Sequence, residues 1–269
     1  MIELFSKNEY VNARQSSKGN QLKWEYENVW YKADYAGYEG LAEYMVSHLL
    51  QHSTLNKNEY VLYDLEEITY KDNLYNGCKS DNFLKDDEML ITLERLFREK
   101  YNQSLYQSVF KIEGVQERIN FIVNNVRDIT GLVEFKEYFA KIITIDALFL
   151  NEDRHTHNIA VIRKSNGTYR LCPIFDNGAC LLSDITIDYP LSKDTYKLID
   201  TVQSKTVAWN FSEQLEECEQ IYDNSIHFNW NRRNVLDLLE NVNDYSEEIK
   251  TRVYEILMEQ RRRNIYLFD

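Results

Sequence analysis

Residues 146–178 have the sequence DALFLNEDRHTHNIAVIRKSNGTYRLCPIFDNG, and this stretch decides the fold that we predict. An apolar helix ends at Leu150, and a run of Asn, Asp, Arg and His residues follows it. Two further segments, 159–162 and 168–174, are typical of strands. Ser165-Asn166-Gly167 joins them, and such a tripeptide favours a hairpin turn. The stretch therefore predicts a helix, then a polar loop, then a β-hairpin.

Three polar residues flank the predicted hairpin. Asn158 stands at the entrance of its first strand, Asp176 follows its second strand, and Asp153 lies on the loop before Asn158. Because antiparallel pairing brings the outer ends of two strands together, we expect the three side chains to converge. Phosphoryl transfer needs such a set: one carboxylate orients or deprotonates a hydroxyl, and an amide oxygen and a second carboxylate hold Mg²⁺. Asp153 and Asn158 also have the spacing of the catalytic Asp and the metal-binding Asn of protein kinases.

The same loop allows a second interpretation. Asp153, His155 and His157 alternate, and side chains of this kind can be the metal ligands of a hydrolase. A zinc site would need a further ligand nearby, and Cys172 and Cys180 flank the wrong end of the hairpin. His155 is also a candidate for positioning the catalytic Asp or a phosphate, whereas His157 is expected to be structural or solvent-facing.

The chain before residue 84 alternates between strand and helix patterns. Residues 21–34 (QLKWEYENVWYKAD) predict two strands with a turn near Glu27-Asn28. Residues 38–52 have the periodicity of an amphipathic helix, and residues 59–67 alternate like a strand. Residues 68–84 predict a loop with room for a short strand.

Helical patterns dominate the rest of the chain. We expect helices over about 87–103, 115–127 and 133–150, and a helical region over about 193–267, in which Trp209 and Trp230 are expected to be core and scaffold residues. The order of elements predicts an α+β fold. A small β-rich N-terminal lobe would span 1–84, and a larger helical C-terminal lobe with the catalytic hairpin would span 85–269.

A nucleotide site would need a lysine on a strand and an acid on a nearby helix that places this lysine. Lys32 ends the second predicted strand, and the next helix carries Glu39 and Glu43 on one face, so either could pair with it. Before the first strand, Ser16, Ser17, Lys18 and Gly19 form a polar turn that suits backbone contacts with phosphates. The segment 76–84, which includes Ser80 and Phe83, is expected to meet the adenine.

Composition limits the remaining classes of function. The 269 residues carry a net charge of −13, which argues against a nucleic-acid-binding surface and against an anionic membrane surface. The four cysteines have no C-x-x-C spacing, so we expect thiols in a reducing cytoplasm. No signal peptide and no membrane span are recognisable, which also predicts a cytoplasmic protein.

NEDRHTHN (151–158), a hairpin and PIFDNG (173–178) together resemble the HipA-like serine/threonine kinases. The loop is more distantly similar to the D-R-H-x-x-N loop of phosphatidylinositol-type kinases. The order Asp-Arg-His differs from the H-R-D of ordinary protein kinases, and Asp176 precedes Asn-Gly rather than Phe-Gly. The resemblance implies a bilobal kinase fold, with ATP and Mg²⁺ as cofactors. It implies Asp153 as the catalytic base, Asn158 as a metal ligand and Asp176 as the main Mg²⁺ ligand, and it favours Glu39 as the partner of Lys32.

The resemblance also implies regulation and partners. HipA-like kinases carry a serine in the loop before the first strand, and some autophosphorylate there, so Ser16 and Ser17 are the candidates. A phosphate on this loop would compete with ATP for its N–H groups. HipA toxins carry an additional N-terminal subdomain that contributes to antitoxin contact. This chain lacks it, so we expect a minimal stand-alone kinase, and a HipB-like antitoxin stays open.

Three functions are therefore compared. The first is a protein kinase that phosphorylates Ser/Thr on a protein substrate, with a toxin–antitoxin role as one form. The second is a lipid or small-molecule kinase on the same scaffold. The third is a pseudokinase that acts as a regulatory binding module. The chain retains Lys32, Asp153, Asn158 and Asp176, which argues against the third.

Overall fold

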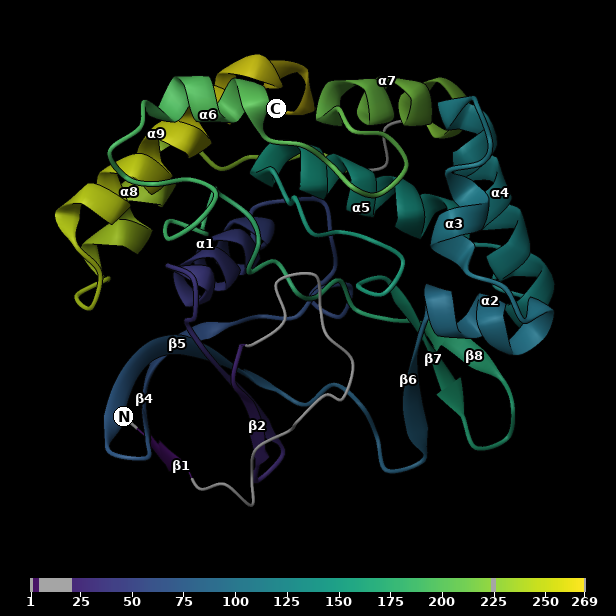
Figure 1. Ribbon diagram of the computed structural model, residues 1–269, viewed down its shortest axis with the longest axis horizontal. Coiled ribbons are helices and arrows are strands. Elements are labelled where there is room, and N and C mark those ends of the chain that lie inside the picture. The colour runs from purple at the N-terminus through teal and green to yellow at the C-terminus, as the bar shows by residue number, and fades with distance from the viewer. Residues whose placement is uncertain (1, 5–20, 224–225, 269) are drawn as a thin grey trace. The chain divides into compact units, whose positions relative to one another are not determined.

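The computed structural model describes residues 2–4, 21–223 and 226–268 (Figure 1). The chain forms two compact units, each collected from separate segments. Unit 1 comprises Met1–Asn82, Phe175–Val202 and His227–Asp269, and unit 2 comprises Phe83–Ile174 and Gln203–Ile226. The division into functional lobes 1–84 and 85–269 stays a prediction. The mixture of a β-rich N-terminal part and a mainly helical remainder confirms the α+β class.

Unit 1 contains a five-stranded sheet with the strand order β1-β4-β5-β3-β2. Its strands are β1 (Ile2–Leu4), β2 (Lys23–Tyr26), β3 (Val29–Ala33), β4 (Asp64–Tyr70) and β5 (Asn73–Asp81). β1 pairs with β4 in parallel, and all other neighbours are antiparallel. The turn predicted at Glu27-Asn28 is confirmed, because β2 and β3 pair around it and both residues have the positive φ of a tight hairpin.

The loop with room for a short strand that the sequence predicts over residues 68–84 is wrong in its extent, because most of the segment is strand. β5 runs through this segment and lies inside the sheet, hydrogen-bonded to β4 on one side and β3 on the other. Its sequence NLYNGCKSD contains Asn, Gly and Asp, which are depleted in strands, so pairing with both neighbours overrides local preference. The strand predicted at 59–67 is shifted, since β4 begins at Asp64 and ends at Tyr70.

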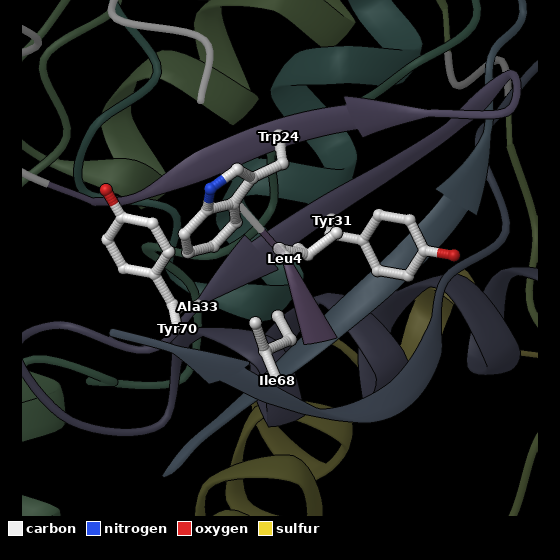
Figure 2. Close-up of a cluster of buried hydrophobic side chains, with 6 residues drawn as sticks. All are labelled: Leu4, Trp24, Tyr31, Ala33, Ile68 and Tyr70. Atoms are coloured by element: carbon white, nitrogen blue, oxygen red, sulfur yellow. The ribbon is translucent and has the colours of Figure 1, made fainter. Parts of the chain in front are cut away.

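Figure 2 shows a cluster of buried hydrophobic side chains from four of these strands. The cluster consists of Leu4, Trp24, Tyr31, Ala33, Ile68 and Tyr70. Trp24 is fully buried and meets Tyr70 edge to face, with ring centroids 5.1 Å apart. Tyr31 and Ala33 point into this cluster, so alternation along β3 places Lys32 on the opposite face of the sheet.

Helix α1 (Glu39–Leu50) packs against β3, β4 and β5. The approach is close at one point, because a Cβ on Gly40 would lie 2.8 Å from the Cα of Gly77 on β5. Glycine at position 40 therefore lets the helix approach β5 closely, and this helps to bring an acidic side chain of α1 to β3. The other helices of unit 1 are α6 (Thr195–Thr201), α8 (Arg232–Glu240) and α9 (Glu247–Arg263).

Unit 2 contains the predicted hairpin, which is confirmed. β7 (Ala160–Lys164) pairs with β8 (Tyr169–Leu171), and Gly167 in the turn has a φ of 83°. β6 (Glu88–Thr92) pairs with the other side of β7, so the helix predicted at 87–103 is wrong at its start. That helix, α2, spans only Leu93–Tyr101. The remaining helices of unit 2 are α3 (Leu105–Val109), α4 (Val115–Thr130), α5 (Phe135–Phe149) and α7 (Phe211–Tyr222).

Among the described residues, no helix combines the length and the apolar character that crossing a bilayer requires. All four cysteines lie in the described part of the chain as buried thiols.

Candidate active site

Lys32 forms the centre of a buried charge cluster in unit 1. Its Nζ lies 2.6 Å from Oε1 of Glu43 and 2.8 Å from Oδ1 of Asp176. Burial by itself lowers the pKa of Lys32, but the carboxylates of Asp176 and Glu43 outweigh burial and hold the pKa well above its usual range. Lys32 is therefore a charged ammonium group fixed between two carboxylates.

The partner of Lys32 on α1 is Glu43, so the preference for Glu39 is wrong. Glu39 is the first residue of α1, and its carboxylate accepts hydrogen bonds from the N–H groups of the preceding turn, at Tyr35, Ala36 and Gly37. Glu43 lies one turn further along and is fully buried. It thus reaches the sheet, while Glu39 closes the turn before the helix.

Asp176 adopts a backbone conformation that is uncommon for a residue other than glycine, with a φ of 63°. The conformation is held from two sides, because the Asp176 carboxylate contacts Lys32 and the next N–H, of Asn177, donates to Glu43 Oε2 at 2.8 Å. Such conformations cost free energy and concentrate at functional sites. Glu43 therefore fixes both Lys32 and the backbone that carries Asp176.

Lys23 is a second lysine at this cluster, and the sequence-based prediction did not include it. Lys23 Nζ lies 3.8 Å from the same Oδ1 atom of Asp176. The signal was available, because a tight turn at Glu27-Asn28 makes Lys23 the cross-strand partner of Lys32. Two ammonium groups, of Lys23 and Lys32, and two carboxylates, of Glu43 and Asp176, thus form a cluster whose formal charges balance.

The loop of unit 2 brings Asp153, His155 and Asn158 together. The Asn158 side-chain N–H₂ donates to the Asp153 carbonyl at 2.8 Å and to Asp153 Oδ2 at 3.2 Å. His155 Nε2 lies 3.8 Å from Asp153 Oδ1. Because the amide nitrogen of Asn158 is directed at Asp153, its amide oxygen is the atom available to a metal. A hard oxygen of this kind fits Mg²⁺.

A buried ion pair between Arg154 and Asp146 anchors this loop. Arg154 Nε donates to both carboxylate oxygens of Asp146 on α5, at 3.1 and 3.2 Å, and Arg154 Nη1 donates to the Asn158 carbonyl at 3.3 Å. Burial raises the pKa of Asp146 to about 6, although Arg154 lowers it. Thr206 closes the arrangement, because its hydroxyl donates to the Arg154 carbonyl at 2.7 Å. The loop is therefore fastened directly after Asp153, through both the side chain and the carbonyl of Arg154.

The alternative metal site of a hydrolase gains no support from the geometry. Throughout residues 2–4, 21–223 and 226–268, no three His, Cys, Asp or Glu side chains gather closely enough to hold a metal ion. His155 and His157 meet as rings, with centroids 5.3 Å apart.

The remaining predicted contacts are placed as follows. Ser80 lies buried on β5 opposite Trp30, and the Phe83 carbonyl accepts a hydrogen bond from Arg170 Nη2 at 3.2 Å. Their proposed contact with adenine stays a prediction. Ser16, Ser17, Lys18 and Gly19 lie outside the described residues.

No protein-family model and no curated protein matches this chain. Among solved structures, it is similar to the Helicobacter pylori proinflammatory kinase CtkA, with a TM-score of 0.61 and 17% sequence identity, over 99% of this chain and 95% of that chain. It also matches a chain of the HipA, HipB and operator DNA complex of the toxin–antitoxin system of Shewanella oneidensis MR-1. That match has a TM-score of 0.38 and 11% identity, over 95% of this chain and 62% of that chain. The likeness to CtkA shows that this chain has a kinase fold.

Proposed function

We propose that this chain is an ATP- and Mg²⁺-dependent phosphotransferase, and in finer terms a HipA-like kinase that phosphorylates Ser or Thr on a protein. The observation that carries the proposal is the position of Lys32 between Glu43 and Asp176 at 2.6 and 2.8 Å. A strand lysine paired with a helix glutamate and placed beside a metal-binding aspartate is the arrangement that kinases use to hold nucleotide phosphates. The kinase fold supports the same conclusion.

The residues of unit 1 would bind and orient the phosphates. Lys32 donates to phosphate oxygens, and Glu43 keeps its ammonium group directed and charged. Lys23 adds a second positive charge at the Asp176 carboxylate. Both lysines then move from a carboxylate partner to phosphate oxygens when nucleotide is bound.

The residues of unit 2 would carry the proton transfer. Asp153 accepts the proton of the attacking hydroxyl, and Asn158 holds the Asp153 carboxylate in place through its amide N–H. The Asn158 amide oxygen and the Asp176 carboxylate are each proposed as a ligand for Mg²⁺. When bound, this ion neutralises charge on the phosphates and orients them. His155 Nε2 lies 3.8 Å from Asp153 Oδ1, so an imidazole ring lies beside the proposed base.

The finer parts of the proposal concern the partner, the regulation and the location of the protein. A toxin–antitoxin role with a HipB-like partner, autophosphorylation of Ser16 or Ser17, and a cytoplasmic setting all belong to it. The setting is supported by four cysteines that remain buried thiols.

Phosphoryl transfer from labelled ATP tests the proposal. Wild-type protein with Mg²⁺ should phosphorylate itself or a Ser/Thr protein substrate, and Asp153→Ala and Asp176→Ala should abolish the transfer. Glu99→Gln, which alters an exposed ion pair with Arg95, is the matched control and should stay active. Lipid and small-molecule acceptors form separate arms. Absence of transfer to every acceptor, together with thermal stabilisation by Zn²⁺ alone and none by ATP with Mg²⁺, would refute the proposal.

A further inference from the structure

Trp209 is an exposed tryptophan in a position where the sequence predicts a core residue. Half of its surface, 50%, is accessible to solvent, while Trp230, for which the same prediction holds, is completely buried. The three residues before Trp209 are buried, so the chain turns outward at this residue. A large aromatic side chain that stays exposed contributes little hydrophobic stabilisation to the fold, so it is a candidate for a binding role.

The indole is held rigidly by its neighbours in unit 2. Trp209 packs against Phe110, with ring centroids 5.4 Å apart and planes inclined by 32°. The guanidinium of Arg118 covers Phe110 at 5.1 Å and donates to the carbonyls of Ile112 and Val207. The Ser204 N–H donates to the Trp209 carbonyl at 3.1 Å and closes the segment into a loop. The aromatic pair is therefore preorganised, which reduces the entropy that a binding partner must lose.

The loop that carries Trp209 is also attached to the loop that carries Asp153. Thr206 lies three residues before Trp209 and donates to the Arg154 carbonyl at 2.7 Å. Consecutive Cα atoms are about 3.8 Å apart, so Trp209 lies within roughly 20 Å of Asp153 along this connection. An extended peptide of about six residues covers such a distance. A substrate segment with its hydroxyl at Asp153 can therefore reach the indole.

The segments that continue the chain from the two aromatic residues carry more exposed acidic than basic side chains. Helix α7 begins directly after Trp209, capped by Asn210, and its exposed side chains include Glu213 and Glu216. The segment after Phe110 adds exposed Glu113 and Glu117. Lys111 and Lys205 are the cations of the same segments, in addition to Arg118, which is directed at Phe110. The balance is negative, as it is for the whole chain at −13.

We propose that Trp209 and Phe110 form a docking surface for a positively charged segment of the protein substrate, with an Arg or Lys side chain over the indole. Tryptophan is the best aromatic partner for a cation, and Trp and Arg dominate the binding free energy of protein interfaces. The neighbouring glutamates steer and orient a basic segment. The proposal rests on the proposed function for the placement of the acceptor hydroxyl at Asp153.

Peptide binding to the full chain without ATP tests the surface separately from catalysis. The probes are two fluorescent peptides with one central Ser, one flanked by Arg residues and the other by Glu residues, followed by fluorescence anisotropy. The Arg peptide should bind wild type, and Trp209→Ala should weaken it by about tenfold or more. Trp209→Phe should restore part of the affinity. Tyr196→Ala, which removes an equally exposed aromatic side chain from unit 1, should leave binding unchanged.

Three outcomes would overturn the docking surface: no binding of the Arg peptide to wild type, equal binding of the Arg and Glu peptides, or equal affinity of wild type and Trp209→Ala. Thermal melting of each variant shows whether the fold is retained, and the substitution affects an exposed side chain. A failure of the proposed function appears elsewhere, as the absence of phosphoryl transfer by wild type. Binding can be measured in either case.

Discussion

Glu94 binds Thr156 twice. The Glu94 N–H donates to the Thr156 carbonyl at 3.0 Å, and the Thr156 hydroxyl donates to the Glu94 carboxylate, also at 3.0 Å. Burial alone would raise the pKa of Glu94, but donors led by the N–H of Tyr106 outweigh it and lower the pKa, so that the carboxylate stays ionised. The first turn of α2 thus anchors the loop that carries Asp153 and Asn158.

We therefore expect Thr156→Val to slow phosphoryl transfer without weakening ATP binding. The variant keeps the shape of the side chain but loses the hydroxyl donor to Glu94. Loss of one hydrogen bond to a charged group costs about 1.5–3 kcal/mol. Because the loop that carries Asp153 is then held less firmly, kcat should fall about tenfold or more while the KM for ATP stays unchanged. Thr156→Ser should restore kcat, and amide hydrogen exchange at residues 153–158 should be faster in the valine variant alone. Unchanged kcat and exchange would show that Glu94 does not position the loop.

Glu43→Gln should reduce kcat/KM for ATP by about ten- to a hundredfold. The change removes the negative charge and leaves a single acceptor oxygen for two donors, Lys32 Nζ and the Asn177 N–H, so the orientation of Lys32 or of the backbone at Asp176 is lost. Steady-state kinetics with varied ATP measures this effect. Glu39→Gln is the matched control on the same helix and should retain wild-type kinetics, because Glu39 binds only the turn at residues 35–37. Equal losses in both variants would assign Lys32 a different partner in the active state.

Asp146→Ala should destabilise the protein by about 3–5 kcal/mol, because it leaves the buried guanidinium of Arg154 without its charge partner. The midpoint of thermal unfolding should fall on the order of 10 °C. Asp128→Ala removes the exposed partner of Arg127 and should cost less than about 1 kcal/mol. Similar effects of the two substitutions on urea unfolding would contradict a structural role for the Asp146–Arg154 pair.

Asp34 should make the protein less stable as the pH rises. Its carboxylate accepts hydrogen bonds from the Gly40 N–H and the Tyr245 hydroxyl, and burial, aided by the nearby Glu39 charge, raises its pKa from 3.8 to about 7. The folded state therefore holds this proton more tightly than the unfolded state. The stabilisation is complete below about pH 4 and is lost as the pH rises through 7.

Urea unfolding at several pH values measures this contribution. We expect a loss of about 2–3 kcal/mol between pH 5 and pH 8 in wild type, and a flatter profile in Asp34→Asn. Asp237→Asn, at an exposed aspartate on α8, should keep the wild-type slope. A wild-type slope in Asp34→Asn would assign the pH dependence to other groups.

Local patterns in the sequence predict the hairpin and the loop before it. A turn tripeptide between two apolar segments specifies β7 and β8, and short-range spacing specifies the contact of Asp153 with Asn158. The same logic fails for β5 and β6. β5 has a polar sequence that becomes a strand only through pairing on both sides. β6 is followed directly by α2, so its residues were included in the pattern that predicts the helix.

The site shows the same limit. Glu39 and Glu43 lie four residues apart on one face of the helix, so spacing does not distinguish them. Only their tertiary contacts do, because Glu43 meets Lys32 while Glu39 accepts from the turn at residues 35–37. The exposure of Trp209 depends on a loop closed by Ser204 and by contacts from α4, which no periodicity reports. Lys23 was within reach of prediction, since the turn at Glu27-Asn28 already sets its register against Lys32.

Unit 1 collects segments from the beginning, the middle and the end of the chain, and this has a consequence for biosynthesis. Lys32 and Asp176 are separated by 144 residues, and Asp34 and Tyr245 by 211. Contacts of such long sequence separation form late, because the entropy of closing a large loop must be overcome first. On the ribosome, the lysine cluster has no Asp176 until more than half of the chain has been made, and α9 arrives last. The contact between Lys32 and Asp176 therefore cannot form through most of the synthesis, and a chain that stops before residue 176 lacks this cluster altogether.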